Sequence, residues 1–280
     1  MTVIMSLFLG LVQGITEFLP ISSSGHLAIL INLFGLEDAE SSNLLFPVLL
    51  HLATLVSISA VYRKELKAMI SDGLDYMRMR GDSDVDEPVV LKPTARALLF
   101  ILIGTLPMFI ALLFYSQVER LFDMTAFVGL ALLITGGLLF VSDKYIARGN
   151  KTEKTMTLLD AVLIGLAQAV AILPGLSRSG TTISVGLARG FSGGFAVRYS
   201  LLLSIPAVIG ATVVSLYRAI RDGADFSLFP IYFVGFIIAA VVGFFAIQLI
   251  RRLMAKGAFG KFAYYCWGLG GLTILLSLIL

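Results

Sequence analysis

Long apolar runs separated by short polar segments dominate the pattern of hydrophobic and polar positions along the chain. Six of these runs contain about 20 apolar residues each, the length that a helix needs to cross the hydrocarbon core of a bilayer. They lie at roughly 44–62, 94–115, 123–142, 195–217, 228–250 and 262–280. The pattern therefore predicts six transmembrane helices.

Two further apolar segments, roughly 1–33 and 157–190, are broken in the middle by Pro, Gly and Ser. Neither half of either segment is long enough to cross the membrane. Non-helical backbone at membrane depth is tolerated only where protein or a water-filled cavity receives its polar groups. We therefore interpret each segment as a re-entrant helix-turn-helix hairpin, which enters and leaves the membrane on one side.

The two broken segments also align with each other. A shift of 155 residues places residues 10–13 on 165–168, both reading Gly-Leu-x-Gln, and residues 22–25 on 177–180, both reading Ser-x-Ser-Gly. A unit of one hairpin and three spans crosses the bilayer an odd number of times, so a second copy must be inverted. Inverted repeats whose broken helices meet near the midplane are a known way to form a membrane site.

The sequence thus predicts an all-α integral membrane protein with an inverted-topology repeat, each half holding one re-entrant helical hairpin and three transmembrane helices. A single membrane domain covers residues 1–280, with the first repeat at 1–142 and the second, inverted repeat at 157–280.

Composition supports the membrane class. Of the 280 residues, 58% are hydrophobic and 14% are charged, whereas about one quarter of the residues of soluble domains are charged. The net charge of +3 does not indicate nucleic acid, because the basic residues flank apolar spans, where they are typical of cytoplasmic loops. The single cysteine, Cys266, lies in an apolar span, so the sequence predicts neither a disulfide framework nor a Cys-based metal cluster.

Lysine and arginine also predict the orientation. Fifteen of them lie in segments 63–96, 143–157 and 251–261, and three lie in segments 116–123 and 218–227. The six-span topology puts the three rich segments on one side, and the positive-inside rule makes that side cytoplasmic. Both termini are then extracytoplasmic.

The loop 63–95 is the one sizeable polar stretch of the sequence. It mixes acidic and basic residues, which is typical of a solvated segment. We interpret it as a solvated linker, with partner binding as the alternative.

Glu17 and Arg178 are the charged residues that lie next to the Ser/Gly breaks of the two hairpins. Ionisable groups at membrane depth are costly and mark functional sites by default. The alternative is a buried ion pair that only locks the two repeats together. The two roles can coexist.

Gln13 lies four residues before Glu17, so both side chains face the same way on a helix. Their oxygens could bind one hard divalent cation, Mg²⁺ or Ca²⁺, with waters and a substrate phosphate completing the shell. An ordinary polar helix face is the alternative for this pair.

The two serine-rich turns favour an anion. They are Ser22-Ser23-Ser24-Gly25 and Ser177-Arg178-Ser179-Gly180, the latter followed by the hydroxyls of Thr181 and Thr182. Backbone N–H groups at a helix N-terminus bind anions, and a guanidinium matches phosphate oxygens. Simple helix caps are the alternative, but two such turns on opposed hairpins favour a phosphate site.

The sequence contains two histidines, His26 and His51. A lone histidine on an apolar helix is usually a core residue, and we expect this of His51. His26 follows the first turn directly, so it could act near Ser23 as general acid, base or nucleophile.

The residues alone leave two functions open. A membrane site with a carboxylate, an imidazole, hydroxyls and an arginine could hydrolyse a lipid-linked phosphate, or it could carry a lipid phosphate or another anion across the membrane. A structural scaffold explains neither Glu17 nor Arg178.

Both turns match one known family. The segment GLVQGITEFLPISSSGH resembles the E/Q-x-x-x-E, P-x-S-S-x-G-H element of the bacterial undecaprenyl-diphosphate phosphatases, the bacitracin-resistance family, and LPGLSRSGTT resembles their P-G-x-S-R-S-x-x-T element. The resemblance implies hydrolysis of undecaprenyl diphosphate to the monophosphate carrier of cell-wall synthesis in the bacterial cytoplasmic membrane, with a divalent cation. It leaves open whether the chain forms a homodimer.

The resemblance also assigns residues. The family's acidic pair corresponds to Gln13 and Glu17, and its remaining site positions correspond to Ser23, His26, Ser177, Arg178 and Thr182. Because Gln13 is not anionic, Glu17 must supply the negative charge here. We expect Ser23, activated by His26 or Glu17, to attack the terminal phosphorus, with His26 or water as alternative nucleophiles.

Overall fold

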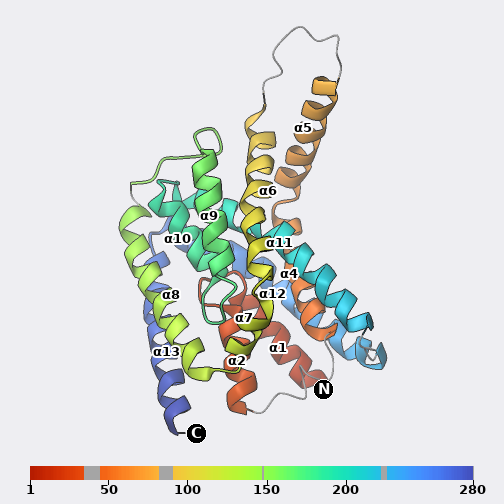
Figure 1. Ribbon diagram of the computed structural model, residues 1–280, viewed down its shortest axis with the longest axis vertical. Coiled ribbons are helices and arrows are strands. Elements are labelled where there is room, and N and C mark those ends of the chain that lie inside the picture. The colour runs from red at the N-terminus through yellow and green to blue at the C-terminus, as the bar shows by residue number, and fades with distance from the viewer. Residues whose placement is uncertain (35–44, 82–90, 147, 222–225, 280) are drawn as a thin grey trace.

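The chain folds as a bundle of helices in the computed structural model (Figure 1), which describes residues 1–34, 45–81, 91–146, 148–221 and 226–279. Within these ranges, β structure is limited to an isolated bridge between Lys151 and Phe191. The prediction of an all-α fold is confirmed.

The helices follow one another along the described parts of the chain. They are α1 (Val3–Thr16), α2 (Ser23–Phe34), α4 (Leu45–Val61), α5 (Arg63–Gly81), α6 (Pro93–Leu112), α7 (Tyr115–Phe122), α8 (Thr125–Ile146), α9 (Leu158–Val170), α10 (Arg178–Ala188), α11 (Gly193–Arg221), α12 (Phe229–Ala255) and α13 (Phe262–Ile279). Two 3₁₀ turns, Phe226–Leu228 and Phe259–Lys261, lead into α12 and α13.

Within the described ranges, five helices, α6, α8, α11, α12 and α13, are long and apolar enough to cross a membrane. Their positions confirm five of the six predicted spans. The sixth, α4, has 17 residues and a length of about 26 Å, slightly less than the hydrocarbon core. It counts as a span only together with α5, from which it is bent by 82°.

The interpretation of residues 63–95 as a solvated linker is wrong for its first part. Residues 63–81 form helix α5, which packs along α6. Leu66 and Met69, one helical turn apart, face the core, and Asp72 accepts a hydrogen bond of 2.7 Å from Lys92 next to the start of α6. The charges of residues 63–81 therefore belong to an amphipathic helix; residues 82–90 lie outside the described residues.

Helices α1, α2, α9 and α10 contain 14, 12, 13 and 11 residues, so each is too short to cross the bilayer. They form two helix-turn-helix pairs at the predicted positions. In Figure 1 the α1–α2 pair reaches the centre of the bundle from the lower end, and the α9–α10 pair reaches it from the upper end. Helix α9 begins 155 residues after α1, and α10 begins 155 residues after α2.

Close glycine contacts fix the first helix of each pair. A Cβ atom at Gly10 would overlap the backbone of Gly235 on α12, and one at Gly165 would overlap the backbone of Gly104 on α6. Gly10 and Gly165 are themselves 155 residues apart. The two pairs thus pack against the bundle through matching positions, which sets the depth at which each turn lies.

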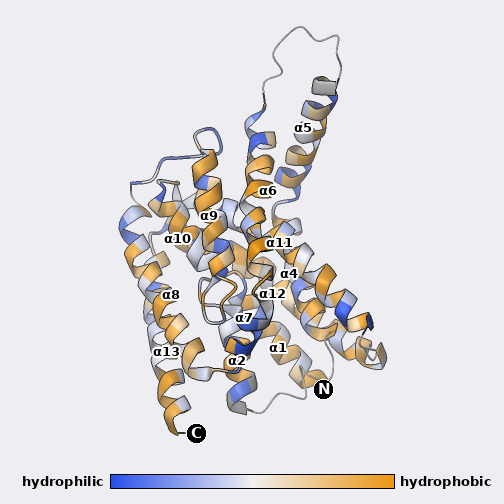
Figure 2. Cartoon of the chain, in the orientation of Figure 1, coloured by the Kyte–Doolittle hydropathy of each residue, from blue (hydrophilic) through white to orange (hydrophobic). Residues whose placement is uncertain are grey.

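The second pair lies deeper in the protein than the first. Helix α10 packs against α8, α9 and α11, and Ile183 and Leu187 on it are buried in the largest hydrophobic cluster. Figure 2 shows apolar residues along the long helices α8, α11, α12 and α13 and hydrophilic residues at several helix ends. Inside the bundle, the buried polar side chains include Glu17, Ser22 and Ser177 at the two turns. A polar centre inside an apolar bundle is the setting in which the two turns meet.

Candidate active site

The first turn connects α1 to α2 through a strained backbone. Ser22 has a φ of +69°, and among the described residues it is the one non-glycine residue with a positive φ. Its Oγ accepts a hydrogen bond of 3.1 Å from the Gly25 N–H, which caps the start of α2. Backbone strain of this kind is maintained only where the surroundings over-determine it, and it is common at functional sites.

The second turn reaches the same capped arrangement with a glycine. Gly175 has a φ of +91° and lies against the backbone of Val128 on α8, where a Cβ atom would not fit. Thr135 Oγ1 donates to the Gly175 carbonyl at 3.0 Å and accepts from the Ser177 N–H at 3.1 Å. Ser177 Oγ then accepts from the Gly180 N–H at 3.1 Å and caps α10, so Arg178 projects from the first residue of a rigid helix.

The two turns are joined to each other. Arg178 Nη2 forms an ion pair with Glu17 Oε1, and two hydroxyls donate across the junction, Ser22 to the Leu176 carbonyl at 3.4 Å and Ser179 to the Leu19 carbonyl at 3.3 Å. The ion pair expected as the structural alternative is therefore present. It also holds both charges at one site.

The second oxygen of Glu17 faces the first turn. Glu17 Oε2 accepts hydrogen bonds of 2.7 Å from Ser23 Oγ and 3.0 Å from Gln13 Nε2. A carboxylate that accepts a hydrogen bond from a hydroxyl is positioned to take its proton. Glu17 is thus connected to both the candidate nucleophile and the candidate phosphate clamp.

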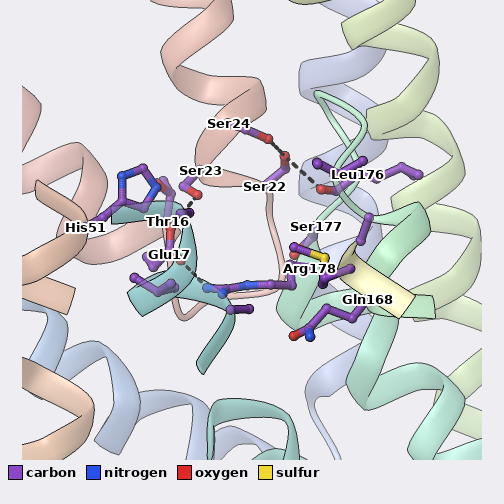
Figure 3. A pocket seen from close by; sticks show the side chains of 16 residues that line it. Thr16, Glu17, Ser22, Ser23, Ser24, His51, Gln168, Leu176, Ser177 and Arg178 are labelled. Atoms are coloured by element: carbon purple, nitrogen blue, oxygen red, sulfur yellow. Dashed lines mark hydrogen bonds and ion pairs between the residues drawn. The ribbon is translucent and has the colours of Figure 1, made fainter. Parts of the chain in front are cut away.

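A pocket of about 160 Å³ opens where these side chains meet. Of the predicted site residues, Glu17, Ser22, Ser23, Ser24, Ser177 and Arg178 line it. Figure 3 shows Arg178 extending across the pocket to Glu17, with Ser22, Ser23 and Ser24 on the opposite wall. Apolar residues of α6 and α11, among them Met108 and Val208, complete the lining.

His26 does not line this pocket. Its Nδ1 lies 2.7 Å from the Ser22 carbonyl oxygen, and its Nε2 lies 2.7 Å from the Tyr265 hydroxyl. The ring lines a separate cavity of about 890 Å³, which also contains Lys256 and Lys261. In this arrangement His26 supports the backbone of the first turn, and its catalytic role stays a prediction.

Six other predicted residues do not line the pocket. They are Gln13, Gly25, Ser179, Gly180, Thr181 and Thr182. Thr182 Oγ1, for example, donates to the Arg178 carbonyl at 2.8 Å and contacts Ser200. The N–H groups of Gly25 and Gly180 are used by the two caps.

Sequence reasoning missed several residues of the pocket wall, among them the polar residues His51 and Gln168. His51 was expected to be a core residue, and its Nδ1 does bond the Pro47 carbonyl at 2.8 Å, but its ring opens on the pocket (Figure 3). Its position as an ionisable group inside a predicted span was a usable signal. Gln168 was visible as the partner of Gln13 at the 155-residue shift.

Hard oxygen donors for a cation lie next to the pocket. Gln13 Oε1 is buried and has no hydrogen-bond partner among the described residues, and it belongs to the same side chain that contacts Glu17. The described residues contain no group of three or more His, Cys, Asp or Glu side chains that could enclose a metal. Gln13 and Glu17 therefore fit an oxygen-seeking cation that shares its shell with water and substrate.

Known proteins match almost the whole chain. A family model described as bacitracin resistance protein BacA matches residues 6–272. A protein named undecaprenyl-diphosphatase from Carboxydothermus hydrogenoformans is 40% identical over 274 residues, which cover 96% of this chain and 95% of the relative. Proteins of the same name from Methanosphaera stadtmanae (37% identical, 99% of each chain) and Methanobrevibacter smithii (39% identical, 96% of each chain) are similarly close.

Proposed function

The chain belongs to the BacA family of bacitracin resistance proteins, and from this premise we propose that it hydrolyses undecaprenyl diphosphate to undecaprenyl phosphate and inorganic phosphate. It is a multi-pass membrane phosphatase that acts on a polyprenyl diphosphate lipid and recycles the carrier used in cell-wall synthesis. The single observation that carries the proposal is the Ser23–Glu17–Arg178 connection, which aligns a hydroxyl, a base and an anion clamp in one pocket.

The chemistry follows from these contacts. The diphosphate enters opposite Arg178, whose guanidinium fork binds two phosphate oxygens, and the two serine turns contribute hydroxyl donors. Glu17 accepts the Ser23 proton while Ser23 Oγ bonds to the terminal phosphorus and the bridging P–O bond breaks, so that undecaprenyl phosphate leaves. Water then attacks the phosphoserine, phosphate is released, and the proton held by Glu17 returns to Ser23.

Electrostatic stabilisation is the main requirement of phosphoryl transfer. Arg178 provides fixed positive charge beside the buried Glu17 carboxylate. A divalent cation, held by Glu17 and Gln13, would neutralise further charge on the diphosphate when bound. Gln13 Oε1 is a buried acceptor without a hydrogen-bond partner among the described residues, which supports the assignment of Gln13 as a ligand of this cation.

We further propose that the two halves form an inverted repeat, with each hairpin re-entrant and both termini extracytoplasmic. The 155-residue spacing of the helix starts supports the repeat. In Figure 1 the two termini lie at one end of the bundle and the basic segment leading into α9 at the other, which agrees with the positive-inside rule. Cysteine labelling in intact cells, on a Cys266-free background, should modify the C-terminus and leave position 151 unmodified; the reverse result would overturn the orientation.

Purified protein tests the activity. A hydrolase needs no sealed bilayer, so the protein in detergent with a divalent cation should release inorganic phosphate from a prenyl diphosphate. A lipid flippase or anion transporter at the same site should release none. Absence of phosphate release across several cations and detergents would favour transport.

A further inference from the structure

Gln168 on α9 is a buried amide without a protein partner. The residue is 1% exposed, and neither Nε2 nor Oε1 makes a hydrogen bond within the described parts of the chain. Buried side-chain amides are nearly always satisfied, because loss of their hydration is costly. A partner from outside the protein is therefore expected at this position.

The amide is directed at the pocket that contains Arg178. Gln168 lines this pocket, and Figure 3 shows its amide end below the Arg178 side chain. Gly165, one helical turn before it, lies against the Gly104 backbone with no room for a Cβ atom. Helix α9 is thus held in place, which keeps the backbone of Gln168 beside the pocket.

Gln13 shows what this position does in the other hairpin. The two glutamines are 155 residues apart, and Gln13 Nε2 donates to Glu17 at 3.0 Å. The position corresponding to Glu17 in the second hairpin is Ile172, which has no acceptor. The same side chain has an internal anion to bind in the first hairpin and none in the second.

We propose that Gln168 binds the terminal phosphate of the substrate, donating Nε2–H to a non-bridging oxygen beside Arg178. The inference rests on the proposed function. A phosphate is favoured over a cation because the Arg178 guanidinium lines the same pocket and attracts an anion, and because the second hairpin has Ile172 at the position of Glu17, so no carboxylate stands beside Gln168 on α9 to share a metal ion. The substrate then supplies the acceptor that Ile172 lacks.

Replacement of Gln168 by glutamate separates the two ligands. Gln168→Glu preserves the shape but removes the donor and adds a negative charge, so we expect KM for a prenyl diphosphate to rise at least tenfold and thermal stabilisation by inorganic pyrophosphate to disappear. Gln117→Glu, which places the same charge on exposed α7, is the matched control and should keep both properties. If Gln168→Glu instead lowered the cation concentration needed for half-maximal activity, the amide would be a metal ligand and the proposal would be wrong.

A second variant shows whether a loss of binding in Gln168→Glu comes from misfolding. Gln168→Met removes the unsatisfied amide, so the ligand-free protein should be at least as heat-stable as the wild type, while stabilisation by pyrophosphate is lost. Wild-type stabilisation by pyrophosphate in this variant would overturn the proposal. Because pyrophosphate binding is measured without turnover, this outcome is distinct from a failure of wild-type protein to release phosphate, which would refute the hydrolase function itself.

Discussion

The two hairpins share the same helix-capping turn but carry different functional side chains. In each, a serine Oγ caps the helix after the turn through an N–H at 3.1 Å. At the 155-residue shift, however, Ser23 corresponds to Arg178, and Glu17 corresponds to Ile172. One hairpin carries the hydroxyl and the base, whereas the other carries the cation.

The two hairpins also differ in how tightly the surrounding helices pack against them. Helix α10, which begins with Arg178, packs against three helices, α8, α9 and α11. Helix α2 packs mainly against α1 and α8. The first turn also stores strain at Ser22, whereas the positive φ of the second turn falls on a glycine, Gly175. The same backbone arrangement thus carries a clamp on the deeply buried helix α10 and a reactive turn followed by the less buried helix α2, and the predictions below test this division.

The largest effect is expected at the nucleophile. Ser23→Ala removes the hydroxyl that donates to Glu17, and loss of a nucleophile typically lowers kcat by more than about 10⁴-fold. Ser24→Ala, whose hydroxyl contacts Ser22, should do far less. Phosphate release and trapping of terminal-phosphate label on acid-quenched protein measure this, and near-normal turnover by Ser23→Ala would point to water or His26 as the nucleophile.

Glu17→Gln should come next. The amide can keep hydrogen bonds to its neighbours but can neither take the Ser23 proton nor carry the negative charge, so kcat should fall by roughly 10²–10⁴. Glu153→Gln, which breaks the Arg198 ion pair outside the pocket, is the matched control. Equal losses in both variants would mean that Glu17 acts only as a structural partner.

Much of the fold could be predicted because the membrane simplifies the pattern. Span length follows from bilayer thickness, and Pro20 and Pro174 with their neighbouring glycines and serines marked the two breaks. Helix α5 was missed because charges at helical spacing look like a solvated linker when the neighbouring helix is unknown. Only the packing of Leu66 and Met69 on the core reveals its buried face.

The proximity of Ser23, Glu17 and Arg178 was predictable, because Glu17 and Ser23 flank one turn and the 155-residue repeat pairs that turn with the one that carries Arg178. His26 shows the limit, since proximity in sequence does not fix the direction of a ring whose nitrogens bond Ser22 and Tyr265. His51 comes from a distant helix. Only tertiary packing decides which wall of the pocket such a residue joins.

Arg178→Lys tests whether the guanidinium of Arg178 binds the phosphate oxygens of the substrate. Lysine keeps the charge but loses the planar fork, so substrate should still bind while kcat falls by about 10–100-fold, a transition-state defect. Steady-state kinetics in detergent separate kcat from KM. Near-wild-type turnover would assign Arg178 to the ion pair with Glu17 alone.

The smallest effect on activity is expected when the hydrogen bonds that hold the second turn against α8 are removed. Thr135→Val preserves side-chain shape but leaves the Gly175 carbonyl and the Ser177 N–H without their partner, which should lower stability by about 1–3 kcal/mol. Activity should fall less than tenfold, because Arg178 and its ion pair remain.

Cys266→Ser is the matched change at the first turn. Its thiol reaches the Pro20 carbonyl at 3.7 Å, and Pro20 corresponds to Gly175 at the 155-residue shift. A thiol is a weak donor, so this variant should change stability by less than about 1 kcal/mol. Thermal denaturation in detergent compares the two, and if Cys266→Ser lowered Tm more than Thr135→Val, the second hairpin would not be the more rigidly framed of the pair.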